Sequence, residues 1–248
     1  MEITPLGFIL GMLLLAPPLY ILYHYRINAW KKTVTALLKM LIVMAMTAFF
    51  LKYIIAWNNI LFNILWFLLA AIVASTILII KGKLRMRRFF LPVCTGIMAG
   101  SLPTALYLMF LSFGIQNPID AQFFIPILGL FFGNMIVVNS KALATYHAGI
   151  NYHTQLYDYL LGNGATHTEA TRYIMRRTIE KTALPGITHL GGIVISSSPV
   201  IMWTMILDGT SVINAAMAQI LIIVAMLCSS IMSIVVTLYI YRRYTIGV

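Results

Sequence analysis

Residues 60–80 read ILFNILWFLLAAIVASTILII, and no charged side chain interrupts them. A helix that crosses a bilayer needs about 20 mostly apolar residues, so this stretch is long enough for one crossing. The rest of the chain has the same character. Of its 248 residues 61% are hydrophobic and only 9% are charged, and the mean hydropathy is +0.93. These properties predict an integral membrane protein built of helices.

Segments of this kind recur along the chain and predict an all-α, polytopic membrane protein with about seven transmembrane helices. The seven are residues 5–24, 33–55, 60–80, 91–114, 122–142, 184–207 and 212–241. The first contains the pair Pro17-Pro18, which predicts a kink near its inner end. No linker or internal repeat is evident in the sequence. We therefore expect a single integral membrane domain over residues 1–248.

The basic residues determine the expected orientation. Lys and Arg lie in alternate loops, except for Lys39 and Lys52, and they give the chain a net charge of +11. By the positive-inside rule those loops are cytoplasmic, so the N-terminus is expected outside and the C-terminus in the cytoplasm. The expected location is the inner (plasma) membrane. Because the charge is explained by topology and lipid headgroups, we expect the bilayer as a partner and no nucleic acid.

One polar stretch, residues 143–183, is the only sizeable segment expected outside the bilayer, and the orientation places it in the cytoplasm. Residues 146–161 predict a helix that continues out of the fifth span. The string Gly162-Asn163-Gly164 then ends this helix, because glycine and asparagine tolerate positive φ. The polar stretch is therefore expected to contain a sharp turn.

A second cytoplasmic helix is expected after the turn. Residues 166–169, THTE, have the spacing of a capping box, in which a threonine and a glutamate satisfy each other's backbone N–H groups. The helix is predicted over residues 167–183, with a basic face, and Pro185 marks the entry into the next span. The whole polar stretch thus predicts two helices joined by a tight turn.

Motifs of enzymatic chemistry are absent from the sequence. The phosphate-binding loop, H-E-x-x-H, C-x-x-C and G-x-S-x-G do not occur. We therefore expect no enzymatic activity and no cofactor in this chain. The six acidic residues lie outside the centres of the spans, so a carboxylate proton relay is not expected. If the protein moves a solute uphill, the energy would come from a partner.

Polar residues within the predicted spans are the candidates for a translocation pathway. They are Lys39, Asn134, Asn139, His189, Ser197 and Gln219. Each also has a structural interpretation. Lys39 could extend its amine to the inner interface, the asparagines beside Gly129 and Gly133 could hold helices together, and a lone histidine is more often a hydrogen-bonding residue than a ligand. No metal site is assigned.

The order of the motifs resembles the FetB-type permease family, membrane subunits of ATP-binding-cassette (ABC) transporters associated with iron export. Residues 125–135, IPILGLFFGNM, resemble the family signature I-P-x-x-G-M-x-x-G-N-x-M. Residues 163–170, NGATHTEA, resemble L-G-A-T-x-x-x-A, and residues 176–185 look like the basic helix that ends in L-I-P. The resemblance covers most of the chain from about Thr33.

The resemblance implies a permease that works as a homodimer with two copies of a separate ATPase, on which ATP and Mg²⁺ bind. Residues 157–166 would be the coupling segment. The ATPase-coupling residues would be Tyr157, Asp158, Gly162, Gly164, Ala165, Thr166, Glu169 and Ala170. The implied cargo is iron, another metal or a small solute, and the implied direction is export.

The sequence departs from the family near the expected pathway. Residues 196–205, SSSPVIMWTM, keep Pro199 but lack the glycines that flank it in the family, and Val43 stands where a glutamine is usual. The identity of the substrate therefore stays open. Two other functions also stay open: a membrane scaffold or regulator whose loop binds a different soluble protein, and a passive channel.

Overall fold

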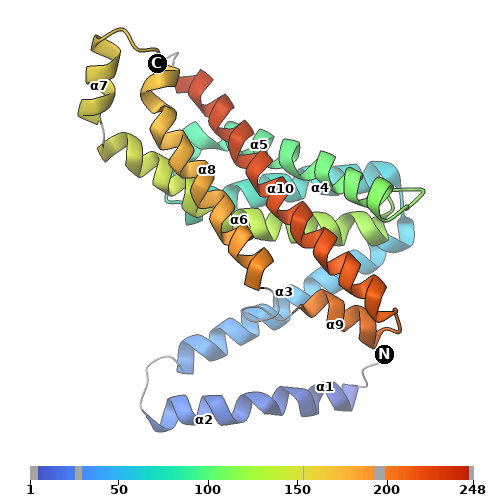
Figure 1. Ribbon diagram of the computed structural model, residues 1–248. Coiled ribbons are helices and arrows are strands. Elements are labelled where there is room, and N and C mark those ends of the chain that lie inside the picture. Colours follow the sequence, from blue (N-terminus) through green and yellow to red (C-terminus); the bar gives the residue numbers. More distant parts are fainter. Residues whose placement is uncertain (1–4, 26–29, 153, 193–198, 246–248) are drawn as a thin grey trace. The chain divides into compact units, whose positions relative to one another are not determined.

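The computed structural model describes residues 5–25, 30–152, 154–192 and 199–245 (Figure 1). All regular elements among these residues are helices, which confirms the predicted all-α class. The chain forms two compact units, Met1–Trp57 and Asn58–Val248. Each unit is described by itself.

The first unit contains α1 (Pro5–Met12), a 3₁₀ turn η1 (Leu13–Leu15), α2 (Ala16–His24) and α3 (Trp30–Trp57). The 3₁₀ turn has a local cause. Pro17 and Pro18 have no N–H to donate to the carbonyl groups four residues earlier, and those carbonyls belong to η1. The proline pair therefore changes the type of helix at the point where a kink was predicted.

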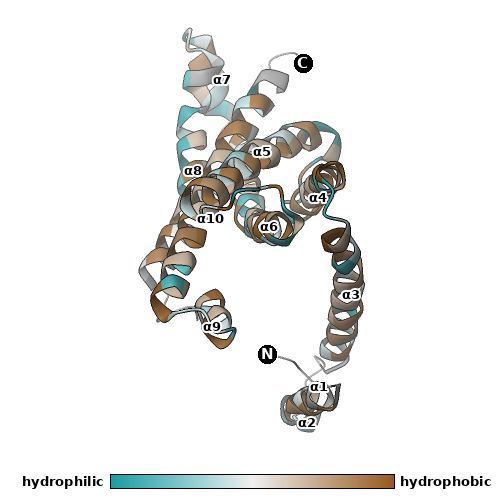
Figure 2. Ribbon diagram, turned by 90° about the vertical axis from the view of Figure 1, so that its right-hand side faces the viewer, coloured by the Kyte–Doolittle hydropathy of each residue, from teal (hydrophilic) through white to brown (hydrophobic). Residues whose placement is uncertain are grey.

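The second unit is a bundle of long helices with a helical loop between α6 and α8. Its elements are α4 (Ile60–Lys81), α5 (Met86–Tyr107), a π-helix η2 (Leu108–Ser112), α6 (Ala121–Tyr152), α7 (Thr154–Gly162), α8 (His167–Gly192), α9 (Val200–Leu207) and α10 (Val212–Thr245). Helix α4 packs on α5 and α6, α10 packs on α5 and α6, and α5 also packs on α6; α8 packs on α6 and α10. Figure 2 shows that hydrophobic residues predominate along the bundle helices.

Among the described residues, five helices are long and apolar enough to cross a membrane. They are Lys32–Trp57, Ile60–Lys81, Met86–Ser112, Ala121–Ile150 and Val212–Arg242. They match five of the seven predicted segments. The protein is therefore a multi-pass helical membrane protein. The predicted first segment is helical but shorter and interrupted by η1, and the predicted sixth segment differs more.

The sixth segment, predicted as one helix over residues 184–207, is not continuous in the described structure. Its first part belongs to α8, which passes through Pro185 to Gly192, and its last part is α9. Residues 193–198 lie outside the described residues. The predicted end of the cytoplasmic helix at Ala183 was also wrong. A methyl group on Gly186 would lie 2.5 Å from Leu227 Cδ1, so α8 still packs closely on α10 after the proline.

Contacts along α10 indicate that α8 and α9 together form the return path of the chain between α6 and α10. The rings of Tyr146 and Tyr241 lie 5.9 Å apart, and Asn134 on α6 bonds to Ser230, so α6 and α10 run in the same direction. The chain between two parallel crossings has to return across the bilayer. Helix α8 runs back along α10 as far as Leu227. Helix α9 continues further toward the start of α10, because the Met202 N–H donates to Gln219 Oε1 at 3.1 Å.

Candidate functional site

The turn between α7 and α8 is specified by the backbone of α7. Gly164 has φ +83°. Its N–H donates to the Leu161 carbonyl at 3.0 Å, and the Ala165 N–H donates to the Leu160 carbonyl at 3.0 Å. These two bonds form a Schellman motif, which ends a helix with a left-handed residue, usually glycine. The predicted helix stop at residues 162–164 is therefore confirmed, and its cause is the conformation of Gly164.

Helix α8 begins immediately after the turn with the predicted capping box. Glu169 Oε2 accepts from the Thr166 N–H at 2.8 Å and from the Thr166 hydroxyl at 2.8 Å. In return the Glu169 N–H donates to Thr166 Oγ1 at 3.4 Å. The backbone N–H of Thr166 is the main reason that the pKa of the Glu169 carboxyl lies below its ordinary value, and the hydroxyl of Thr166 and the charge of Arg172 act in the same direction.

Only three residues, Asn163, Gly164 and Ala165, separate the end of α7 at Gly162 from Thr166, the cap of α8. The chain therefore changes direction over very few residues without losing backbone hydrogen bonds. A turn built in this way transmits a displacement of α7 to α8, since few torsion angles are free to absorb it. The geometry suits a mechanical connection between a soluble partner and the membrane helices.

One face of α8 is anchored to the bundle. Its buried residues recur every three or four positions and are Ala170, Thr171, Ile174, Thr178 and Thr182. At Gly149 on α6, a methyl group would lie 2.9 Å from Ile174 Cγ2, so the two helices approach closely there. The hydroxyl groups of Thr178 and Thr182 donate to carbonyls of their own helix. The arginines of α8 lie on the exposed side, as the predicted basic face required.

The predicted coupling residues fall on three neighbouring pieces of this loop. Tyr157 and Gly162 lie on α7, Gly164 and Ala165 in the turn, and Thr166, Glu169 and Ala170 at the start of α8. Ala170 is buried, whereas Gly162 and Gly164 are exposed. The side chain of Asp158 lies outside the described residues. The loop thus brings most of the predicted residues together around one turn.

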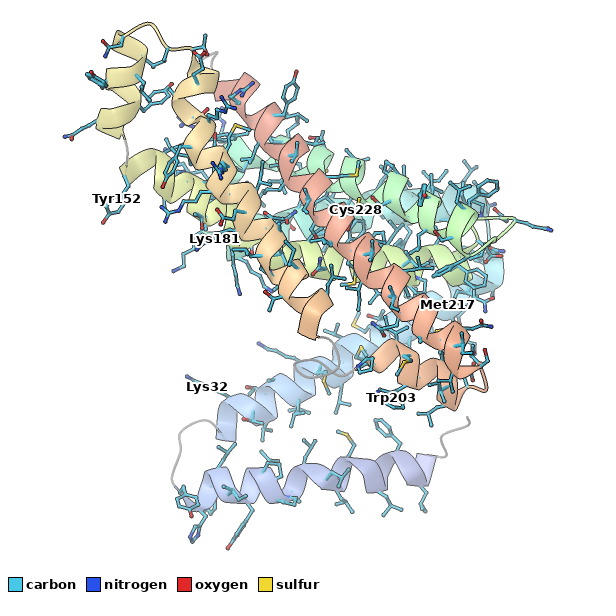
Figure 3. All side chains as sticks on the ribbon, viewed as in Figure 1. Lys32, Tyr152, Lys181, Trp203, Met217 and Cys228 are labelled. Carbon is cyan, nitrogen blue, oxygen red and sulfur yellow. The ribbon has the colours of Figure 1, made fainter. Side chains whose placement is uncertain are left out.

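The helix predicted over residues 146–161 is described in two parts. Residues 146–152 are the end of α6, and residues 154–161 belong to α7 (Thr154–Gly162). Figure 3 shows Tyr152 at the end of α6. Residue 153 lies outside the described residues. Helix α7 contacts both α6 and α8.

Inside the bundle, two asparagines of α6 bond to the same turn of α10. The Asn134 side-chain amide donates to Ser230 Oγ at 2.7 Å and to the Met226 carbonyl at 3.3 Å. The Asn139 amide donates to the Ser230 carbonyl at 3.3 Å. Polar side chains of this kind join helices within a bilayer. The interpretation of these asparagines as bonds between helices is confirmed.

The second unit also contains buried polar side-chain atoms without a hydrogen-bond partner. Among the described residues, three buried side-chain atoms have no partner: Asn63 Oδ1, Asn139 Oδ1 and Ser233 Oγ. Asn139 is only 1% exposed. An unpaired polar atom in a membrane interior is costly, so such atoms need an explanation. Asn139 Oδ1 is able to accept from a water or a polar solute, which keeps this residue a pathway candidate.

The other pathway candidates lie in different parts of the chain. Lys39 is exposed on α3 of the first unit. Gln219 is buried and links α10 to α9 through its bond to Met202. Ser197 lies outside the described residues, as does the side chain of His189. Among the described residues of the second unit, the structure therefore groups Asn134 and Asn139, and it gives Gln219 a structural contact.

A close contact between α5 and α10 was missed by the sequence analysis. On α5, a methyl group at Gly100 would lie 2.5 Å from the Ser229 carbonyl oxygen and 2.7 Å from the Ser233 N atom, and one at Gly96 would collide with Thr237. The signal is present in the sequence as small residues four positions apart on both helices. By contrast, no atom lies within 4 Å of a methyl group at Gly129 or Gly133.

Comparisons with known proteins give one match. A family model described as "Uncharacterised protein family (UPF0014)" matches residues 5–245. Neither the curated proteins nor the solved structures gave a match to this chain.

Proposed function

We propose that this chain, which belongs to the uncharacterised protein family UPF0014, is the membrane-spanning permease subunit of an ABC transporter. A separate ATPase would bind at the loop formed by α7, the turn and the start of α8. The chain itself would carry no ATP site. This proposal develops the resemblance of the GN and GAT motifs to FetB-type permeases.

The observation that carries the proposal is the doubly capped turn between α7 and α8. Thr166 and Glu169 fix the start of α8, and Gly164 fixes the end of α7. A soluble protein that binds α7 would therefore move α8 as well. In an ABC transporter this is the task of the coupling segment, which passes closure of the ATPases to the membrane helices.

The length of α8 supports the same role. At 1.5 Å per residue, the distance along the helix axis from Thr166 to Gly186 is about 30 Å. Gly186 packs on Leu227, near the middle of the long apolar helix α10. A force applied at the turn would thus reach the middle of the bundle through one helix. A loop that only rests on lipid headgroups would not need this connection.

We further propose that the transporter contains two copies of this chain with a pathway between them. The open positions at Gly129 and Gly133 support a second copy at this face of α6, because small residues allow close approach of helices in bilayers. The proposed cargo is iron, another metal or a small solute, and the proposed direction is export.

The proposal is tested by copurification. The full chain is expressed in turn with each stand-alone ABC ATPase of its own organism, and the complex is isolated through a tag on the chain. The variant Gly164→Trp should lose the ATPase. The matched control is Gly209→Trp, since Gly209 also has a positive φ, +96°, also has open space around it, and lies in the connection expected on the opposite side.

Loss of the ATPase from Gly164→Trp alone supports the proposal. Retention by both variants would place the docking surface elsewhere. If no ATPase copurifies with the unaltered chain, or if its activity does not respond to the chain, a scaffold, regulator or channel becomes the better interpretation. The cargo is tested separately, by measuring metal accumulation in cells that lack the protein, where export predicts a rise.

A further inference from the structure

The first turns of α8 pass the last turns of α10 (Figure 1). Side chains of these two segments line a groove. Its volume is about 840 Å³, and three arginines line it: Arg172, Arg176 and Arg242. Met175 and Ile179 supply an apolar floor, and Glu169 is the single acidic residue in the lining. The Glu169 carboxylate already accepts two hydrogen bonds from Thr166. The groove is therefore positive at its rim and apolar at its base.

The position of the groove along the bilayer normal follows from α10. Arg242 closes the apolar stretch that begins at Val212, so its guanidinium lies at the edge of the hydrocarbon region. Arg242 Nη1 lies 3.9 Å from Met175 Sδ, which fixes this part of α8 at the same level. Arg172 and Arg176 are one helical turn apart on α8. The three arginines thus surround a site at headgroup depth.

We propose that this groove binds the phosphate-containing headgroup of an anionic phospholipid. Arginine binds phosphate with two parallel N–H donors, and a basic pocket between membrane helices on the cytoplasmic side favours anionic lipids. The apolar floor at Met175 and Ile179 accommodates the glycerol and the upper acyl chain. A free phosphate ion would leave this floor exposed to water. The inference stands without the transport function proposed above.

The test uses the purified full chain in a neutral detergent. Native mass spectrometry measures how much phosphatidylglycerol and phosphatidylcholine stay bound from an equimolar mixture. The double variant Arg172→Gln/Arg176→Gln should weaken phosphatidylglycerol retention about 25-fold, since one basic residue near a membrane surface contributes about fivefold. Both arginines are exposed, so the variant should still elute as a single folded species.

The matched control is Arg177→Gln/Lys181→Gln, which removes the same charge from the exposed side of α8 outside the groove. Figure 3 shows Lys181 further along the same helix. The control should keep phosphatidylglycerol retention within about twofold of the unaltered chain. Equal loss of phosphatidylglycerol retention in both double variants would overturn the proposal, because it would show that retention depends only on the net charge of the protein.

Two further results would also overturn it. Displacement of the lipid by millimolar glycerol 3-phosphate would assign the groove to a soluble phosphate compound. Unchanged lipid retention in Arg172→Gln/Arg176→Gln, with loss of a copurifying ATPase, would assign it to an acidic protein surface. Failure of ATPase copurification in the unaltered chain would leave the lipid result intact, so the two proposals can fail independently.

Discussion

In the contact between α5 and α10, a glycine is required by its neighbours, whereas in the turn between α7 and α8 a glycine is required by its own backbone. Gly100 lies within a regular helix, and a methyl group there would meet backbone atoms of α10 at 2.5 and 2.7 Å. Gly164 has no atom within 4 Å of such a methyl group, but its φ is +83°. The first position is limited by space and the second by conformation.

This difference separates the fixed part of the second unit from the part suited to movement. The α5–α10 contact has no room for a side chain, and it holds two long helices at a short separation. The α7–α8 turn has well-defined hydrogen bonds within itself and open surroundings. A segment of that kind is able to move as one piece while keeping its shape, which is what a coupling element needs.

The largest expected effect is that of Gly100→Ala. The added methyl group meets the Ser229 carbonyl and the Ser233 N atom, and backbone atoms of this kind do not move aside easily. We expect a loss of about 3 kcal/mol in the free energy of unfolding, at the upper end of the usual cost of overpacking. Denaturant titration of the purified chain measures it.

The control for this prediction is Gly11→Ala on α1, where nothing lies within 4 Å. Alanine is the better helix former by about 1 kcal/mol, so this variant should be neutral or more stable. If both variants lose stability equally, the helix propensity argument fails and the α5–α10 contact is not as close as described.

A smaller and more local effect is expected for Gly164→Ala. An alanine at φ +83° costs about 1–2 kcal/mol, but it creates no collision. Amide hydrogen exchange should become faster over residues 165–170, while the midpoint of global unfolding changes little. Equal exchange in both proteins would show that the turn does not depend on the left-handed conformation.

The bond between Asn134 and Ser230 should contribute about 0.6 kcal/mol, the average for such bonds between membrane helices. A double-mutant cycle with Asn134→Ala and Ser230→Ala measures the coupling directly. Additive effects of the two substitutions would contradict the 2.7 Å hydrogen bond. Coupling well above 2 kcal/mol would indicate that other groups depend on the pair.

The smallest effect concerns pH and the capping box. The pKa of the Glu169 carboxyl is below its ordinary value of 4.5 in the folded protein, mainly because of the Thr166 N–H. The cap therefore contributes its full stability above pH 4.5 and loses it as the pH falls through the lower, folded pKa. Hydrogen exchange in the first turn of α8 should speed up over that acidic range.

Glu169→Gln separates this titration from other effects of acid. A glutamine keeps an oxygen that accepts from Thr166, but it does not titrate. The variant should show no acid-dependent change in the first turn of α8. A change of the same size in both proteins would place the titrating group elsewhere.

Local sequence rules predicted the parts of the fold that depend on local physics. Long apolar runs located five spanning helices, and the pattern THTE located the start of α8. The same kind of rule failed near Pro185, because the helix predicted to end at Ala183 continues through the proline to Gly192. Packing of the neighbouring Gly186 on Leu227 accompanies the helix beyond the proline, and a contact with a distant segment is not visible in a local pattern.

The candidate site was predictable to a similar extent. The residues that the family resemblance implied for coupling lie around one turn, and Asn134 and Asn139 were located by their polarity in apolar surroundings. Their partner Ser230 was not, because it lies 96 residues after Asn134. The contact of Gly96 and Gly100 with α10 was missed for the same reason. The spacing of residues indicates which face of a helix makes contacts, but it does not indicate which other helix packs on that face.

The long separation between α6 and α10 has a consequence for the newly made chain. Asn134 enters the bilayer with α6, but Ser230 is synthesised 96 residues later. Because synthesis proceeds at about 5–20 residues per second, roughly 5–20 s pass between the synthesis of the asparagine and that of its partner. The glycine face of α5 waits longer still. During that interval the incomplete protein exposes polar amides and the backbone at its glycines to lipid. A chain truncated before α10 exposes these groups permanently, and membrane quality-control machinery can recognise them.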